Sequence, residues 1–226
     1  MRNIEIYNEN KEFSSFSNEK LSSFMAVDST FSHCLFENMK VDNFCFGGGY
    51  NKTKYINCSF DNSVFSSKSP GVAYFEGCTF RNVRIKNFFC VEADFVNCIF
   101  SGRIEKGNFI GVYRDLDGTS IINKYEGNDF RLMLLDDVGF TNIDFSLQLM
   151  PDNPHQFVIS DVMNFINTVE YNIGNISDKA IRDAVVKVVN IIRLEVKGSN
   201  NQIFIDKRSF PNSLQNALDF IVSYIK

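Results

Sequence analysis

The chain has 226 residues, 24 of them phenylalanine and none tryptophan, and its formal net charge is −4. This length is enough to bury a sizeable core, and the slightly negative charge excludes a general binder of polyanions. The first residues are not an apolar run and no stretch is long enough to cross a bilayer, so we expect a cytosolic protein without a secretion signal.

Between Phe31 and Phe100 the sequence repeats itself. Four segments align, Phe31–Phe36, Tyr55–Phe60, Phe75–Phe80 and Phe95–Phe100, and each has a cysteine in its fourth position. These cysteines, Cys34, Cys58, Cys78 and Cys98, lie 24, 20 and 20 residues apart. A five-residue period nested in a twenty-residue period indicates that four short sides make one turn of a coil.

Apolar residues continue this five-residue grid in both directions. Before an insertion at Gly47–Tyr50 the grid positions are Phe16, Leu21, Ala26, Phe31, Phe36, Val41 and Phe46; afterwards they run from Tyr55 to Met150. Pro70 and Glu105 interrupt the grid, and Ile110 is expected to restore it. Further interruptions at Asp115 and Ser120 predict that residues 113–124 bulge out as a loop, with the register otherwise kept from 55 to 150.

Residues on either side of each grid position predict extended sides joined by corners. The residue two before it is small or apolar, as at Ser29 and Ala73, which gives the alternation of a strand. The residue two after it is mostly Asn or Gly, including Asn57 and Gly107, and these types tolerate a left-handed corner. His33 occupies such a position, so we expect it to be a corner residue.

This double period resembles that of the pentapeptide-repeat proteins over roughly residues 14–152. The resemblance implies a mainly β fold, a right-handed quadrilateral β-helix of nearly seven coils. The sequence departs from the family pattern in using Phe far more than Leu, and in the interruptions near 105–120.

The six cysteines do not suggest a disulfide framework in a chain of this length. Five lie on inward positions, Cys34, Cys58, Cys78, Cys90 and Cys98, whereas Cys45 is expected to point outward. A zinc site is the alternative, but thiols stacked in one file do not form a tetrahedron. We therefore expect small buried hydrophobic residues, with no metal and no cofactor.

The two ends are expected to cover the open coil, with residues 1–13 as an N-terminal cap and 153–226 as a C-terminal helical segment. Three runs there have helical spacing, one beginning near Val158, one after a candidate N-cap at Ser177, and one after Pro211. Gly198 is a candidate helix stop, and Gln202–Asp206 a short strand. These helices should pack on one another and on the last coil. The alternative is that they form a homodimer or hold a partner.

No catalytic pattern is present, because the only histidines are His33 and His155 and no nucleophile–base or metal-ligand motif surrounds them. The glycine-rich run at Gly47–Gly49 lacks the spacing of a phosphate-binding loop and is better explained as a corner bulge. We expect a protein that is not an enzyme, with no small-molecule substrate and no membrane contact.

Surface charge is the remaining signal. Residues 113–152 carry three basic residues against eight acidic ones, −5, whereas 81–106 is mildly basic. We expect a rigid binding face for a protein partner, a basic toxin domain that an immunity protein would neutralise. The candidate contacts are Asp115, Asp117, Glu126, Asp129, Asp136 and Asp137.

Two other functions remain open. Some pentapeptide-repeat proteins protect DNA gyrase by imitating a DNA duplex, but they are strongly anionic rods, unlike this chain. Nucleic-acid binding would need exposed aromatic residues on a basic face, whereas most phenylalanines here are predicted to point inward.

Overall fold

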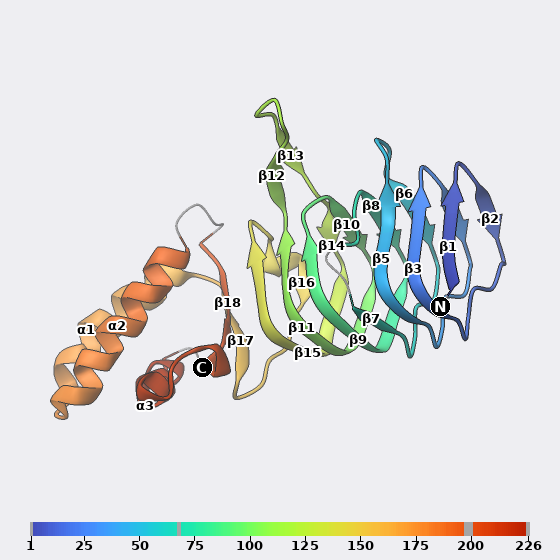
Figure 1. Cartoon of the computed structure of the whole chain (residues 1–226). Helices are drawn as coiled ribbons and strands as arrows, with labels where there is room; N and C mark the ends of the chain where they lie inside the picture. Colours follow the sequence, from blue (N-terminus) through green and yellow to red (C-terminus); the bar gives the residue numbers. More distant parts are fainter. Residues whose placement is uncertain (1, 67–68, 197–200, 225–226) are drawn as a thin grey trace. The chain divides into compact units, whose positions relative to one another are not determined.

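The computed structural model of the chain describes residues 2–66, 69–196 and 201–224, and divides into two compact units (Figure 1). The first unit comprises Met1–Ile143 and Leu147–Met150, and the second comprises Asp144–Ser146 and Pro151–Lys226.

The first unit is a parallel β-solenoid of about seven turns, which confirms the expected mainly β coil. One sheet has eight strands in the order β1 (Arg2–Tyr7), β3 (Lys20–Val27), β5 (Lys40–Gly48), β7 (Val64–Ser66), β9 (Thr79–Cys90), β11 (Ile99–Ile110), β15 (Asn128–Thr141) and β16 (Gln148–Leu149). The other has six, in the order β14 (Tyr125–Glu126), β10 (Ala93–Val96), β8 (Ala73–Glu76), β6 (Thr53–Ile56), β4 (Thr30–Ser32) and β2 (Asn10–Glu12). All these pairings are parallel.

The described residues of the expected N-terminal cap belong to the same two sheets. Strand β1 pairs with β3 and β2 pairs with β4, both in parallel, so these residues supply strands of the first turn.

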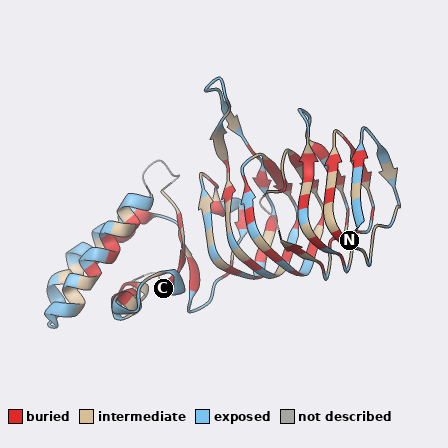
Figure 2. Cartoon of the chain, in the orientation of Figure 1, coloured by how far each residue is buried: buried red, intermediate tan, exposed pale blue. Residues whose placement is uncertain are grey.

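Aromatic rings fill the interior because residues one turn apart lie directly over one another. The rings of Phe36, Phe60, Phe80, Phe100 and Phe130 form one stack, with successive centroids 4.9, 4.7, 4.9 and 4.5 Å apart and planes within 7° of parallel. A second stack contains Phe31, Tyr55, Phe75 and Phe95, each 4.9 Å from the next. Buried and exposed residues alternate along the strands as a packed core requires (Figure 2).

A file of cysteine and amide side chains runs beside the rings. Cys34, Cys58, Cys78 and Cys98 are buried free thiols in one column, as expected, and Cys45 is only partly buried. Each thiol of this column contacts a carbonyl of the preceding turn. For example, Cys78 Sγ donates to the backbone carbonyl oxygen of Tyr55 at 3.2 Å. Amide side chains take over in the last turns, where Asn128 donates to Phe95 O at 2.7 Å and Gln148 to Tyr125 O at 2.6 Å.

Corners have left-handed backbone at most of the expected positions. Residues with positive φ there include Asn38, Asn57, Asn62, Asn82, Asn87, Asn97, Asn142, Gly77 and Gly127. His33 has φ of 54°, which confirms it as a corner residue, and its ring stacks on Phe13 at 5.2 Å.

The register between 100 and 110 differs from the prediction. Ile104 and Phe109 are the fully buried residues, Ile110 is only partly buried, and the left-handed corner falls at Lys106 instead of Gly107. One side is therefore a residue shorter than its neighbours, and Ile110 does not restore the grid. Gly102 permits this, because a Cβ there would lie 2.2 Å from the Val83 carbonyl oxygen.

The second unit combines a two-stranded antiparallel ribbon with helices. It contains β17 (Gln156–Ile159), β18 (Ile203–Asp206), α1 (Val162–Asn172), α2 (Lys179–Glu195) and α3 (Gln215–Val222). Short 3-10 turns in it occupy Ile173–Asn175, Lys207–Ser209 and Asn212–Leu214, and a further one, Phe145–Leu147, spans the boundary between the two units in the sequence. The three helices share one apolar core, which confirms their expected mutual packing. Their packing on the last coil stays a prediction.

Several local predictions for this unit are corrected. Val158 lies in strand β17 and not in a helix, and Asp178 caps α2 in place of Ser177, because its carboxylate accepts from the amides of Ala180 and Ile181. The expected strand and the position of Pro211 directly before a helical turn are confirmed. Gly198 lies outside the described residues. Among the helices described, none has the length and apolarity needed to cross a membrane.

Candidate functional site

Both irregular segments of the sequence emerge from the same edge of the solenoid. At this edge the chain passes from the eight-stranded to the six-stranded sheet, through two residues between β3 and β4 but through residues 49–52 between β5 and β6. Between β11 and β14 the passage takes residues 111–124. We call these crossings the loop edge, and Figure 1 shows the β12–β13 hairpin and the loop before β6 projecting from it.

The longest crossing forms an antiparallel hairpin of β12 (Val112–Arg114) and β13 (Ser120–Ile122), where the sequence predicted only a loop. Its tip is closed by a network on Thr119, whose amide donates to Oδ1 of Asp115 and to Oδ1 of Asp117, both at 2.9 Å. Contact with the Asp115 side chain, together with these bonds from Thr119, lowers the pKa of Asp117 to about 2. The tip is thus a closed, acidic turn.

A buried polar clamp fixes the base of the hairpin. The Asn123 side-chain amide donates to the carbonyls of Val91 at 2.6 Å and Ile110 at 2.7 Å. Lys52, from the other projecting loop, forms an ion pair with Asp94 at 2.7 Å and reaches Asn123 Oδ1 at 3.4 Å. Side-chain exposure is only 27% for Lys52 and 9% for Asp94, so an ion pair largely withdrawn from water joins this loop to β10, and the bond from Lys52 to Asn123 links it to the hairpin base.

Sequence reasoning missed these clamp residues. Asn123 stands two before Tyr125, an inward grid position, and is 4% exposed. The sequence did contain a signal for Asn123. Its position elsewhere holds Cys, Ala or Ser, and an amide buried there must form hydrogen bonds.

Carboxylates lie beside two tyrosines at and near the loop edge. The pKa of Tyr113 is raised by burial, then by the neighbouring Glu92. Burial raises the pKa of Tyr74 to about 12, helped by Glu76, which accepts its hydroxyl at 2.9 Å, and by Asp94.

Large apolar side chains are presented at both projecting tips. Tyr50 at the tip of the first loop and Leu116 at the tip of the hairpin are fully exposed, and Ile122 on β13 is 75% exposed. Leu116 stands between Asp115 and Asp117, so an apolar group is flanked by two carboxylates.

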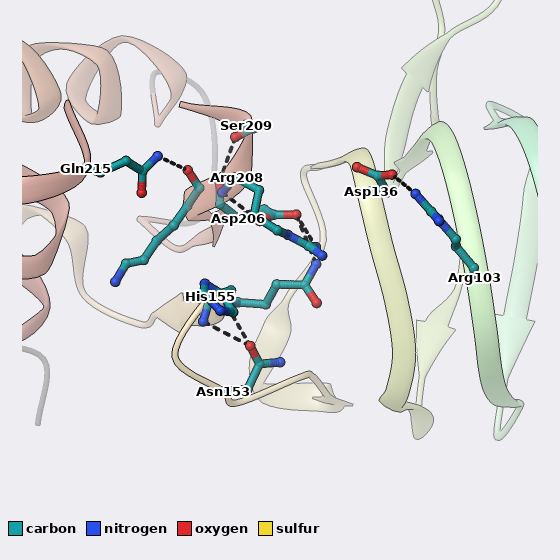
Figure 3. Close-up of polar contacts among 10 residues, drawn as sticks. Arg103, Asp136, Asn153, His155, Asp206, Arg208, Ser209 and Gln215 are labelled. Atoms are coloured by element: carbon teal, nitrogen blue, oxygen red, sulfur yellow. Dashed lines mark hydrogen bonds and ion pairs between the residues drawn. The ribbon is translucent and has the colours of Figure 1, made fainter. Parts of the chain in front are cut away.

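The structure divides the six predicted contact residues. Asp115 and Asp117 form the hairpin tip, and Glu126 is exposed on β14 directly after the hairpin. The others have local structural roles. Asp129 is ion-paired with Arg131 at 2.7 Å, Asp136 is paired with Arg103 across β11 and β15 (Figure 3), and Asp137 has the left-handed backbone of a corner. Asp136 is thus engaged by a cation of the wall, whereas the Asp137 side chain is exposed.

Charges of both signs share the outer wall of strands β9, β11 and β15. Glu105 contacts Arg84 at 2.8 Å, and Lys86 and Arg103 at 3.3 Å each. This wall is a network of mutually neutralised groups and offers no continuous anionic strip.

In the second unit, polar groups gather around Asp206. Its carboxylate accepts from Arg208 at 2.6 Å and from the Gln156 amide at 3.1 Å (Figure 3). Lys207 is ion-paired with Asp219. The backbone amide of His155 donates to Asn153 Oδ1 at 3.0 Å. These interactions fix the end of β18 and the turn after it, and they show no paired nucleophile and base.

Within the described ranges, no group of three or more His, Cys, Asp or Glu residues is placed to hold a metal ion. The sequence matches no model of a known protein family, and no curated protein is significantly similar to it.

Proposed function

We propose that this chain is a protein-binding module of the pentapeptide-repeat type, with right-handed four-sided coils, and that it acts in the cytosol as an immunity protein for a cationic toxin domain. The observation that supports this most directly is the hairpin tip. Leu116 is fully exposed between Asp115 and Asp117 on a turn whose backbone is already closed.

Such a tip contributes little to the fold that carries it. A leucine left in water forgoes about 1.5–3 kcal/mol of burial free energy. The buried clamp at the hairpin base holds the element in place before any partner arrives, which lowers the entropic cost of association. An apolar anchor within an acidic rim complements an apolar pocket within a basic rim, which a nuclease-like toxin would present.

The ion pairs on the outer wall favour this function over gyrase protection. A duplex mimic needs extended unneutralised negative charge, whereas Asp129, Asp136 and Glu105 all have cationic neighbours. Inhibition of gyrase poisoning in a supercoiling assay would reverse this preference.

The test co-expresses the chain with the product of each gene neighbouring its own and assays toxicity, growth rescue and binding. The double variant Asp115→Asn/Asp117→Asn keeps acceptor oxygens for Thr119 but removes both charges. We expect it to weaken binding about tenfold or more, equivalent to about 1.4 kcal/mol, with the wild-type affinity falling as salt rises. Asp183→Asn, on an exposed position of α2, is the matched control and should leave binding unchanged. Absence of rescue and of any complex would refute the proposal.

A further inference from the structure

Strands β12 and β13 form a two-stranded sheet of their own. Its strands have three residues each and pair only with each other, so within the described part of the chain neither strand has a second partner. An isolated two-stranded hairpin is marginally stable in water, and a third strand stabilises it. The ribbon therefore has two open edges that can accept one.

The hydrogen bonds identify which backbone groups lie on these edges. The bonds from Asp115 N to Thr119 O at 3.1 Å and from Asn123 N to Gly111 O at 2.8 Å mark hydrogen-bonded pairs of the ladder. Bonded and non-bonded pairs alternate in an antiparallel ribbon. The N–H and C=O groups that point outward are therefore those of Val112 and Arg114 on β12, and of Ser120 and Ile122 on β13.

The two edges differ in charge and apolarity. Arg114 is exposed on β12 and lies directly opposite Ser120, so a cationic chain approaching the β12 edge meets a like charge. Strand β13 has no charged residue and presents Ile122, which is 75% exposed. Asp117 lies in the turn before β13, and Lys124 and Glu126 follow it, so carboxylates outnumber cations along the chain on the β13 side, whereas on the β12 side Arg114 stands next to Asp115.

We propose that the β13 edge accepts an extended, cationic segment of the partner protein as a third strand of the hairpin. The outward groups of Ser120 and Ile122 would bond to the main chain of that segment, which supplies affinity. Alternate side chains would supply specificity, with an apolar residue over Ile122 and Lys or Arg beside the carboxylates. The inference rests on the proposed function only for the class of partner.

The test begins with a random dodecapeptide phage library selected on the purified full chain. We expect enriched sequences to alternate apolar residues with Lys or Arg. For a synthetic enriched peptide, Ser120→Pro should raise Kd about tenfold or more, because it removes one outward N–H and the bond that group makes to the peptide. Val112→Pro, at the uncharged outward position of β12, is the matched control and should change Kd less than about twofold, because proline is tolerated where the N–H points to solvent.

A second measurement avoids any effect of proline on folding. In amide hydrogen exchange on the wild-type chain, the bound peptide should slow exchange at Ser120 and Ile122 but not at Val112 and Arg114. This pattern distinguishes strand addition from contact through side chains alone.

Several results would overturn the inference: no enriched peptides, enriched acidic peptides, or unchanged exchange at Ser120 and Ile122 in the complex. Sedimentation showing a dimer that protects these amides without peptide would make a second copy of the chain the occupant instead. The inference and the proposed function fail separately. Toxin neutralisation that survives Ser120→Pro refutes only strand addition, whereas peptide binding without neutralisation of any toxin refutes only the immunity function.

Discussion

The regular turns and the loop edge of this solenoid use the same residue types in opposite ways. In the turns, Phe60 lies between two parallel rings, and Cys78 contacts a carbonyl one turn away. At the loop edge, Leu116 is fully exposed and a ribbon is left with open edges. The repeated residues stabilise the scaffold. Where the sequence departs from the period, exposed side chains and unpaired strand edges are available for binding.

The largest expected difference between the two regions is in stability. Phe60→Ala should lower the free energy of unfolding by about 3–5 kcal/mol, because it opens a cavity between the rings of Phe36 and Phe80. Leu116→Ala removes a side chain that contacts water and should change the free energy of unfolding by less than about 0.5 kcal/mol. Denaturant unfolding of both variants measures this. Similar losses in the two would mean that the hairpin tip is part of the core.

Breaking the buried clamp should lower the free energy of unfolding more than breaking any ion pair of the outer wall. Lys52→Met leaves the Asp94 carboxylate, 9% exposed, without its cation. Removing one partner of a fully buried pair costs 3–5 kcal/mol, and the partial exposure of Lys52 reduces this to about 1–3 kcal/mol. Arg131→Gln breaks the exposed pair with Asp129 and should cost at most about 1 kcal/mol. Faster amide exchange at Asn123 in Lys52→Met alone would show that the loss is local to the hairpin base.

The five-residue grid identified most of the buried interior because each turn imposes the same alternation on its sides. The grid failed between Phe100 and Ile104, where one side of the coil is a residue shorter than the others. Glu105 was recognised as an interruption, but whether the chain absorbs it by a bulge or by a shorter side depends on Gly102 approaching Val83 in the neighbouring turn. That approach is a contact between turns, and a local period carries no information about it.

Prediction of the candidate site was limited by the same long-range contacts. Acidic residues were found from composition, but their availability depends on partners 33 residues away, as for Asp136 and Arg103. The clamp joins Lys52 to Asn123 across 71 residues, through loops that share an edge only after the turns have stacked. In the sequence, only the inward position of Asn123 could have indicated that the clamp exists.

Two buried tyrosines provide a finer comparison inside the core. Tyr55 donates its hydroxyl to the Phe46 carbonyl at 2.9 Å, whereas the Tyr125 hydroxyl has no hydrogen-bond partner among the described residues. Tyr55→Phe should therefore cost about 0.5–1.5 kcal/mol, and Tyr125→Phe should be neutral or stabilising by about 1 kcal/mol. Unfolding free energies measured side by side decide this. A loss for Tyr125→Phe equal to that for Tyr55→Phe would imply a buried water at Tyr125.

The smallest effect is expected at the hairpin tip, in acid. Asp117 has a pKa of about 2 in the folded chain against 3.8 for an ordinary aspartate, so its charge supports the closed turn above about pH 4, and this support is lost as pH falls through about 2. The side-chain carboxyl carbon of Asp117 should shift in NMR spectra with a midpoint near pH 2, and the loss of its resonance in Asp117→Asn assigns it; the Thr119 amide cannot serve alone because it also donates to Asp115. A midpoint near 3.8 would mean that the tip is open in solution. The hairpin would then present no preformed edge at Ser120, and a partner strand would have to meet the cost of ordering it.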